Sequence, residues 1–206
     1  FPQFDPIAIP IWGDFGIRWY ALAYLAGILL GWAMCYWASN KYQDASTIRP
    51  SHFSDFIGWA AIGIVLGGRL GYVVFYDLSY YLANPLQIFQ IWQGGMAFHG
   101  GFLGVLVVVW LFTRHHKLPT LRFADFIAVA APIGLFFGRI ANFFNNELWG
   151  RPADVPWAVV FPVPQELQAY YPMVARHPSQ LYEALLEGVL LLALLFAAIN
   201  ISSIRN

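Results

Sequence analysis

Several ionisable side chains lie within long apolar stretches of this sequence, where charged groups are rare. Arg69 and Arg139 each lie about 24 Å along an apolar helix from its expected start, and Glu183 and Glu187 lie one and two turns into a later stretch. His99 lies near the start of another. A charge in the hydrocarbon core of a membrane costs about 2.5–3.5 kcal/mol on insertion scales. Because several such groups fall at one depth, we expect a shared polar cavity; the alternative is a set of ion pairs that joins the helices.

Two arginines without a cluster of metal ligands suit an anionic group, most simply a phosphate that accepts forked hydrogen bonds from guanidinium N–H groups. In the outer leaflet of a membrane the abundant phosphates belong to phospholipids. The sequence has no HExxH zinc motif and no GxSxG pattern for a nucleophilic serine. Its single cysteine, Cys35, lies in an apolar stretch where thiolate formation is disfavoured. The residues therefore predict phosphate binding rather than metal or cysteine chemistry.

The composition indicates that lipid is the main solvent of the elements that carry these side chains. Of the 206 residues, 59% are hydrophobic and only 11% are charged, whereas soluble domains carry about 25% charged residues. An apolar stretch of about 20 residues spans the membrane as a helix, because backbone groups in lipid must pair internally. We therefore predict an all-α integral membrane protein, a polytopic helix bundle with a small extracytoplasmic cap. Its single membrane domain has five expected spans, at about residues 19–39, 53–76, 96–113, 123–144 and 178–199.

The distribution of basic residues between the spans predicts their orientation, since lysine and arginine are enriched in loops that face the cytoplasm. One side would hold Lys41, Arg49, Arg114, Lys117, Arg122 and Arg205. The other side would hold only Arg18, Arg151 and Arg176. The N-terminus is therefore expected outside and the C-terminus inside. The net charge of zero argues against a basic surface for nucleic acid.

Two connections on the outer side are expected to have structure of their own. Residues 77–95 are too short to span the membrane and amphipathic enough to lie in its interface. Residues 145–177 would form the cap, with a short strand at 157–161. Glycines at intervals of four predict close packing of the second and third spans. They are Gly63, Gly67, Gly71, Gly100 and Gly104.

Four strings of residues resemble hallmark segments of the bacterial prolipoprotein diacylglyceryl transferases. They are GRIANFFNNELWGR at 138–151, GGMAFHGG at 94–101, GGRLGY at 67–72 and RHPSQLYE at 176–183. Phe4-Asp5-Pro6 and Arg18-Trp19-Tyr20 also fit, and the order and spacing match across almost the whole chain. Ala141 and Asn146 depart from the pattern, which has glycine at both positions. Chains of this family are expected to continue beyond the fifth span with further membrane helices, one of which carries another arginine.

The resemblance implies a reaction at the bacterial cytoplasmic (inner) membrane. The family transfers the diacylglyceryl group of phosphatidylglycerol to the thiol of a lipobox cysteine in a prolipoprotein. The product is a thioether, the by-product is glycerol 1-phosphate, and the step is the first in lipoprotein maturation. No metal or organic cofactor is implied. The implied partners are phosphatidylglycerol, prolipoprotein signal peptides and membrane lipid, with no nucleic acid.

The resemblance also implies roles for individual residues. His99 is the candidate general base, because an imidazole exchanges protons near neutral pH; the alternative is a histidine that only hydrogen-bonds a neighbouring helix. Arg139 would hold the lipid phosphate and stabilise the departing phosphomonoester, the alternative being an ion pair. Arg69 would support phosphate binding or brace the cavity, with bracing favoured. The other expected substrate-binding residues are Tyr20, Asn142, Glu147, Gly150 and Glu183.

Each of these five residues also has a second interpretation. Tyr20 suits a hydrogen bond to the phosphate, but also anchoring in the aromatic belt at the membrane surface. Asn142 and Glu147 can position the glycerol headgroup or orient the nearby arginine, and Glu147 can equally hydrogen-bond the backbone of its loop. Glu183 can hold an arginine in place, and Gly150 can shape substrate entry at the start of the cap. The signal helix of a prolipoprotein must enter sideways from lipid, which implies a gap between spans.

A membrane transporter or channel for an anionic or lipid substrate is the main alternative function. It predicts polar residues along a continuous path to the inner face and broken helices near the midplane. The polar residues of this sequence stop about halfway, which argues against it. An intramembrane protease would need a serine, paired aspartates or a metal motif at depth, and only Ser179 is a candidate. A purely structural subunit leaves the arginines unexplained.

Overall fold

The structure is a computed structural model of the chain and describes residues 7–12, 15–42 and 47–200. Phe4-Asp5-Pro6, which fit the family pattern, and Arg205, which contributes to the predicted orientation, lie outside the described residues. The chain divides into two compact units. The first unit comprises residues 1–34 and 128–206, and the second comprises residues 35–127.

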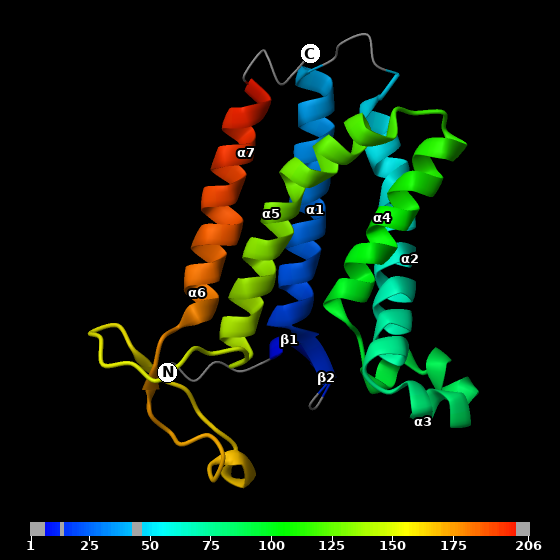
Figure 1. Cartoon of the computed structure of the whole chain (residues 1–206). Coiled ribbons are helices and arrows are strands. Elements are labelled where there is room, and N and C mark those ends of the chain that lie inside the picture. Colours follow the sequence, from blue (N-terminus) through cyan, green and yellow to red (C-terminus); the bar gives the residue numbers. More distant parts are fainter. Residues whose placement is uncertain (1–6, 13–14, 43–46, 201–206) are drawn as a thin grey trace. The chain divides into compact units, whose positions relative to one another are not determined.

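Five helices in the described part of the chain are long and apolar enough to cross a membrane (Figure 1). Four of them are α1 (Trp19–Lys41), α2 (Pro50–Phe75), α4 (Phe98–His115) and α5 (Thr120–Phe144). The fifth, Ser179–Asn200, is a continuous helix made of α6 (Ser179–Glu183), the π-helical η4 (Ala184–Leu190) and α7 (Leu191–Asn200). Each of the five overlaps one of the ranges expected to span. The prediction of an all-α membrane protein is confirmed.

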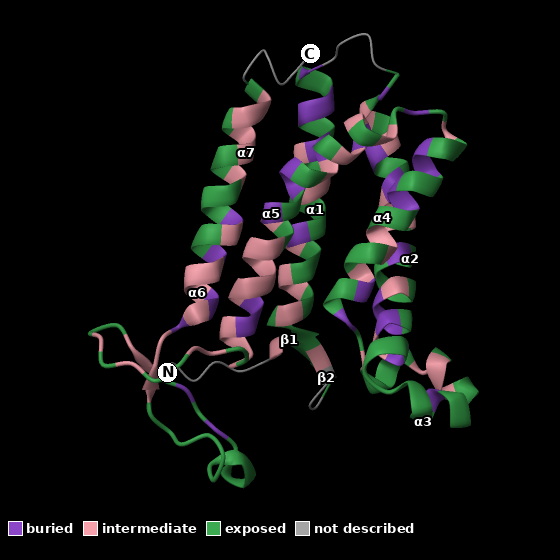
Figure 2. Cartoon of the chain, in the orientation of Figure 1, coloured by how far each residue is buried: buried purple, intermediate pink, exposed green. Residues whose placement is uncertain are grey.

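Apolar side chains cover the outside of these helices, as a lipid solvent requires. Within the described residues, at most 33% of the most apolar 18-residue stretch of any span is buried. Figure 2 shows exposed residues all along the helices. Examples from four different spans are Leu29, Leu66, Leu106 and Leu194. In water such side chains would be buried, and in a membrane they contact acyl chains.

Glycines bring α2 and α4 into backbone contact in the second unit. A Cβ on Gly71 would lie 2.6 Å from the Cα of Gly100, and a Cβ on Gly67 would lie 2.8 Å from the Cα of Gly104. Only a hydrogen atom fits at these positions. The close approach is the one that glycines at intervals of four predict.

Aromatic rings fill the other end of the second unit. Phe53 of α2 stacks on Phe123 of α5 with ring centroids 4.8 Å apart. Phe112 of α4 is fully buried, with its ring 5.3 Å from that of Phe123. The buried Cys35 thiol donates a hydrogen bond to the Phe126 carbonyl oxygen at 3.4 Å. Cys35 is therefore a packed core residue, which agrees with its apolar surroundings in the sequence.

In the first unit, α5 packs between α1 and the helix Ser179–Asn200 (Figure 1). A Cβ on Gly27 of α1 would lie 3.3 Å from the Cα of Gly134 in α5. On the other side of α5, a Cβ on Gly188 would lie 2.6 Å from the Cβ of Phe136. Small residues thus set the spacing of the helices here as well.

Two short antiparallel sheets lie outside the spans in the described chain. β1 (Ile7–Trp12) pairs with β2 (Phe15–Arg18) immediately before α1, a hairpin that the sequence analysis did not predict. β3 (Val159–Val160) pairs with β4 (Ala175–Arg176) in the cap. The strand expected at 157–161 is therefore present but only two residues long.

The cap closes on a small core of its own. Phe161 is buried, and its ring centroid lies 6.0 Å from that of Phe143 and 6.3 Å from that of Trp149. The connection from β3 to β4 contains one short 3₁₀ helix, η3 (Gln165–Leu167). This core holds the cap against the end of α5.

The connection between α2 and α4, residues 77–95, contains three short helices and is called the interfacial segment below. They are α3 (Leu78–Ala83), η1 (Pro85–Phe89) and η2 (Ile91–Gln93). The segment exposes large apolar side chains, each 74–78% accessible. They are Leu82, Leu86, Phe89 and Trp92. Because the segment joins the ends of two spans, it lies where those spans leave the lipid, and its apolar surface suits the membrane interface.

Candidate active site

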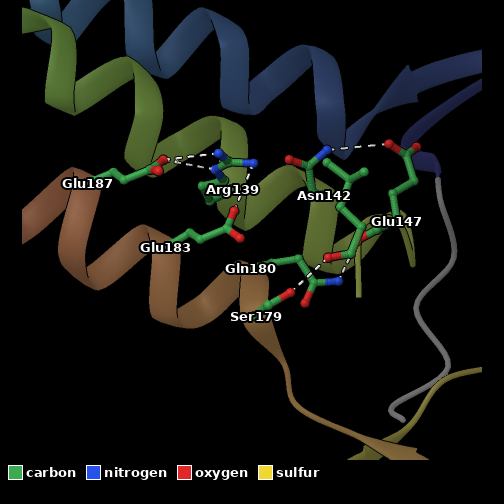
Figure 3. A network of polar contacts seen from close by, with 8 residues as sticks. Arg139, Asn142, Glu147, Ser179, Gln180, Glu183 and Glu187 are labelled. Atoms are coloured by element: carbon green, nitrogen blue, oxygen red, sulfur yellow. Dashed lines mark hydrogen bonds and ion pairs between the residues drawn. The ribbon is translucent and has the colours of Figure 1, made fainter. Parts of the chain in front are cut away.

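Arg139 of α5 contacts two carboxylates of the neighbouring helix (Figure 3). Its Nη1 lies 2.8 Å from an oxygen of Glu183. Its Nε and Nη2 donate to one oxygen of Glu187 at 3.1 and 3.0 Å. We call these three half-buried residues the arginine cluster. Two carboxylates and one guanidinium give it a formal charge of −1, and the ion pair that the sequence analysis kept as an alternative is present.

The fifth span changes from α-helix to π-helix between the two glutamates of the arginine cluster. Glu183 ends α6, and Glu187 lies within the π-helical residues Ala184–Leu190. Wide turns of this kind are rare and frequent at functional sites. The buried Gly188 lets α5 approach at this turn, since a Cβ there would lie 2.6 Å from the Cβ of Phe136. The close approach of the two helices brings both carboxylates within reach of one guanidinium.

A second polar group ties the end of α5 to the start of α6 (Figure 3). The buried Asn142 amide donates to an oxygen of Glu147 at 3.3 Å, and the Glu147 N–H donates to the Asn142 carbonyl oxygen at 2.9 Å. The fully buried Gln180 amide donates to the Glu147 carbonyl oxygen. The Ser179 hydroxyl donates to the Leu148 carbonyl oxygen at 2.9 Å. These bonds fix the turn in which α5 ends and the cap begins.

The two departures from the family pattern are both compatible with this fold. Asn146 has a φ of 59°, a left-handed conformation that glycine adopts freely and that asparagine tolerates better than most residues. Its amide also donates to the Pro162 carbonyl oxygen at 2.5 Å. Ala141 is buried within α5, where alanine is the most favourable helix former.

Gly150 joins the two ends of the cap. Its N–H donates to the His177 carbonyl oxygen at 3.0 Å, and a Cβ on Gly150 would lie 2.8 Å from the same oxygen. The hydroxyl of Tyr182 lies 3.1 Å from the His177 ring and accepts from the Trp157 indole at 2.6 Å. In this structure Gly150 is thus a backbone joint between the cap and α6, and its expected effect on substrate entry stays a prediction.

Tyr20 of α1 contacts Tyr24 one turn further along. The two hydroxyls lie 3.1 Å apart and the ring centroids 4.8 Å apart. A phenol can both donate and accept, so the Tyr20 hydroxyl retains capacity for another hydrogen bond. Phosphate binding and anchoring at the membrane surface both remain predictions for this residue.

His99 is the second residue of α4, and its side chain is exposed. Its ring lies edge-on to that of Phe98, with centroids 5.7 Å apart. Just before the helix, the Ala97 N–H donates to the Gly68 carbonyl oxygen of α2 at 2.9 Å. The start of α4 is therefore tied to α2 and presents an accessible imidazole. Whether that imidazole acts as a base stays a prediction.

Arg69 of α2 is only 4% exposed, and carbonyl oxygens of the interfacial segment surround its guanidinium. The five acceptors, at 2.5–3.4 Å, are those of Gln87, Ile88, Gln90, Gly94 and Gly95. A guanidinium has five N–H donors, so all of them are engaged. These bonds hold the interfacial segment against α2, and the bracing of a cavity that the sequence analysis favoured stays a prediction. A direct contact between Arg69 and a phosphate stays a prediction, and it would require the release of one of these bonds.

The expected site residues fall into two groups, one in each unit. The first unit holds Tyr20, Arg139, Asn142, Glu147, Gly150 and Glu183, and the second holds Arg69 and His99. The structure pairs Arg139 with Glu183 and Asn142 with Glu147.

Four residues of the network were not predicted as site residues: Ser179, Gln180, Glu187 and Gly188. The sequence analysis considered Glu187 only as a partner in an ion pair, which is present. Gln180 lies inside the string RHPSQLYE, which is the signal that can point to it. Gly188 is a single glycine in an apolar span and gives no such signal. No group of three or more His, Cys, Asp or Glu side chains able to hold a metal ion occurs among the residues that the structure describes.

The five helices of the described chain that are long and apolar enough to cross a membrane define a multi-pass membrane protein. Residues 6–205 match the model of the family described as prolipoprotein diacylglyceryl transferase. The chain belongs to this family.

Relatives that carry the name phosphatidylglycerol–prolipoprotein diacylglyceryl transferase share about half of the residues of this chain. The identity is 53% with the protein of Azospirillum brasilense, 52% with that of Agrobacterium fabrum and 48% with that of Methylocella silvestris. The alignments cover 98–100% of this chain and 70–74% of the relatives.

Proposed function

We propose that this chain transfers the diacylglyceryl group of phosphatidylglycerol to the lipobox cysteine of prolipoproteins, the first step of lipoprotein maturation. The observation that carries the proposal is the family match over residues 6–205. The names of the relatives state both substrates, the lipid and the prolipoprotein. The arginine cluster and the accessible His99 support it chemically, because the transfer needs an anion-binding group and a base.

The reaction replaces a carbon–oxygen bond with a carbon–sulfur bond. The sulfur of the substrate cysteine attacks the glyceryl carbon that carries the phosphate ester, and the bond from that carbon to the ester oxygen breaks. The phosphate leaves on glycerol 1-phosphate, and the proton of the thiol passes to a base. Two demands follow: the thiol must lose its proton to become a nucleophile, and the charge that grows on the leaving phosphate must be stabilised.

His99 meets the first demand as general base. Its imidazole is exposed at the start of α4, so a thiol at the end of a membrane-inserted signal helix can approach it. No side chain of this chain has to act as nucleophile, because the sulfur comes from the substrate. For the same reason, the reaction does not require the buried Cys35 to act as a nucleophile.

Arg139 meets the second demand. The two carboxylates engage at most three of its five N–H groups, so donors remain for a phosphate oxygen. The cluster carries a formal charge of −1, and an added phosphodiester anion therefore favours the loss of one carboxylate contact. Glu187 accepts from two guanidinium nitrogens and Glu183 contacts one. Glu187 therefore keeps the arginine in place while Glu183 yields its position to the phosphate.

The polar residues beside the cluster suit the remainder of the lipid headgroup. Asn142 lies three residues after Arg139 on α5, hence on the same face of that helix, and its pair with Glu147 offers donors and acceptors to glycerol hydroxyls. The Tyr20 hydroxyl adds one more donor for the phosphate. Gly150 acts indirectly, by holding the cap at the entrance.

The protein lies in the bacterial cytoplasmic membrane as one membrane domain, with its N-terminus, the cap at 145–177 and the interfacial segment on the outer side. The clustering of Arg114, Lys117 and Arg122 around the short connection between α4 and α5 supports a cytoplasmic location for that connection. The signal peptide enters from the lipid, as its hydrophobic helix requires.

Incubation of the purified protein with vesicles and a lipobox peptide tests the proposed function. With phosphatidylglycerol we expect the peptide to gain the mass of one diacylglyceryl group, together with released glycerol phosphate. Vesicles of phosphatidylethanolamine and a peptide with serine in place of the lipobox cysteine serve as controls. Arg139→Ala should abolish transfer while the protein still inserts into the membrane. Wild-type turnover in that variant would contradict the role of Arg139, and no mass gain with the unaltered chain would contradict the function.

A further inference from the structure

A buried arginine in a membrane helix needs partners for all of its donors, and Arg69 finds them in the backbone of the interfacial segment. Among the residues that the structure describes, no carboxylate lies within ion-pair distance of Arg69; its five acceptors are carbonyl oxygens of residues 87–95. The Tyr81 ring lies 5.1 Å from the guanidinium carbon and adds a cation–π contact. The carbonyl groups of one short segment thus solvate the positive charge of Arg69.

This segment depends on Arg69 in turn. The 3₁₀ helices η1 and η2 are only five and three residues long, and the last carbonyl groups of a short helix have no partner inside it. Nη2 donates to the carbonyl oxygens of Gln87 and Gln90, which also accept from the N–H groups of Gln90 and Gln93, and Nε donates to the carbonyl oxygen of Ile88. One guanidinium therefore ties successive turns of the segment to α2.

Two glycines let the chain pass directly over the guanidinium. Gly94 and Gly95 have φ values of 86° and 80°, in the region that side chains disfavour. A Cβ on Gly95 would lie 2.8 Å from Nη1 of Arg69 and 2.8 Å from the Tyr72 ring. Nη1 donates to the carbonyl oxygens of both glycines.

The clamped glycines lead straight into the turn that carries His99. Only Met96, Ala97 and Phe98 separate Gly95 from His99, and the Ala97 N–H is bound to the carbonyl oxygen of Gly68, the neighbour of Arg69. We propose that Arg69 is a positioning residue: it clamps residues 87–95 and thereby sets where the His99 imidazole lies. The inference rests on the proposed role of His99 as base.

The competing role for Arg69 is direct contact with the lipid phosphate. The two roles make different demands on the side chain. A phosphate contact needs mainly positive charge, which lysine supplies. The clamp needs a planar group with five donors spread over five carbonyl groups, and lysine has three donors on one atom. The conservative substitution therefore separates the roles.

Kinetics of three variants test the clamp. We expect Arg69→Lys and Arg69→Gln to lower kcat by a similar factor, roughly 100-fold, because a misplacement of about 1 Å has that effect, with KM for phosphatidylglycerol unchanged. Gly95→Ala keeps the charge but displaces Nη1, and should have the same signature. Arg114→Lys, an exposed arginine at the far end of α4, is the matched control and should retain wild-type kinetics. If Arg69→Gln instead raises KM for phosphatidylglycerol and Arg69→Lys keeps the wild-type KM, the clamp is overturned in favour of phosphate contact.

A spin label provides a readout that does not depend on activity. Phe89→Cys places a label on the exposed face of η1, and Leu103→Cys places a control label on the exposed face of α4. Cys35 is buried and does not compete for the label. Arg69→Lys and Gly95→Ala should increase the mobility of the label at 89 and leave the label at 103 unchanged. Unchanged mobility at 89 in a folded variant would overturn the clamp whether or not the chain transfers lipid.

Discussion

At the scale of single residues, the proposed mechanism divides the chemistry between proton transfer by His99 and charge stabilisation by Arg139. Replacing His99 with glutamine keeps a hydrogen-bonding side chain but removes the base. We expect His99→Gln to lower turnover at neutral pH by roughly 10²–10⁴-fold, the usual contribution of general base catalysis. The loss should shrink as the pH rises past about 8.5, where a cysteine thiol ionises without help.

A pH–rate profile with the lipobox peptide measures this. His115→Gln, at the opposite end of α4 and also exposed, should leave the profile unchanged. Full activity of His99→Gln at every pH would remove the base assignment and leave only a hydrogen-bonding role.

At this scale, the most informative feature of the sequence is the presence of charged residues within apolar stretches. The cost of charge in lipid indicated that Arg139 needs a partner, with a phosphate favoured and an ion pair as the alternative, and Glu183 and Glu187 form that ion pair. The partners of Arg69 were not predictable in the same way. Backbone carbonyl groups occur at every residue and leave no trace in the sequence, so nothing in the string GGRLGY indicates which segment the guanidinium binds.

At the scale of elements, the glycine contact between α2 and α4 sets the packing of the second unit. A Cβ on Gly67 would lie 2.8 Å from the Cα of Gly104, whereas a Cβ on Gly58, on the same helix, would meet nothing within 4 Å. We expect Gly67→Ala to destabilise the protein by about 1–3 kcal/mol, the usual effect of overpacking. Gly58→Ala should be neutral or slightly stabilising, because alanine is the better helix former.

Unfolding of both variants in detergent, followed by circular dichroism, measures the difference between the midpoints. If both substitutions shift the unfolding midpoint only slightly, α2 and α4 adjust their spacing freely. In that case the contact would not fix the position of the His99 turn.

The elements differ in how far the sequence could predict them. Apolar length suffices for the spans, because a backbone in lipid has no alternative to the helix. The β1–β2 hairpin lies outside the lipid, where that constraint is absent, and its few residues carry little pattern. The π-helical stretch Ala184–Leu190 contains Gly188, which packs against Phe136, a residue far away in the sequence. Neither the π-helical hydrogen-bond register nor this contact has a local signal in the sequence.

At the scale of the whole molecule, the reaction requires that both substrates reach the site from one side of the membrane. The cap follows α5, and the connection between α4 and α5 lies at the other end of that helix, so a single span separates them. The proposed orientation places the cap outside and the basic connection in the cytoplasm. Lipobox cysteines that have been exported then meet the cap side, where the arginine cluster lies near the end of α5.

Labelling of introduced cysteines in right-side-out spheroplasts tests this orientation. Asp154→Cys lies exposed in the cap, and Arg114→Cys lies exposed at the end of α4; the native Cys35 is buried and gives no background. We expect a membrane-impermeant maleimide to label position 154 in intact spheroplasts and position 114 only after permeabilisation. The reverse pattern would place the arginine cluster at the cytoplasmic end of α5. An exported thiol could not then reach Arg139, and the proposed transfer would need a substrate presented from inside the cell.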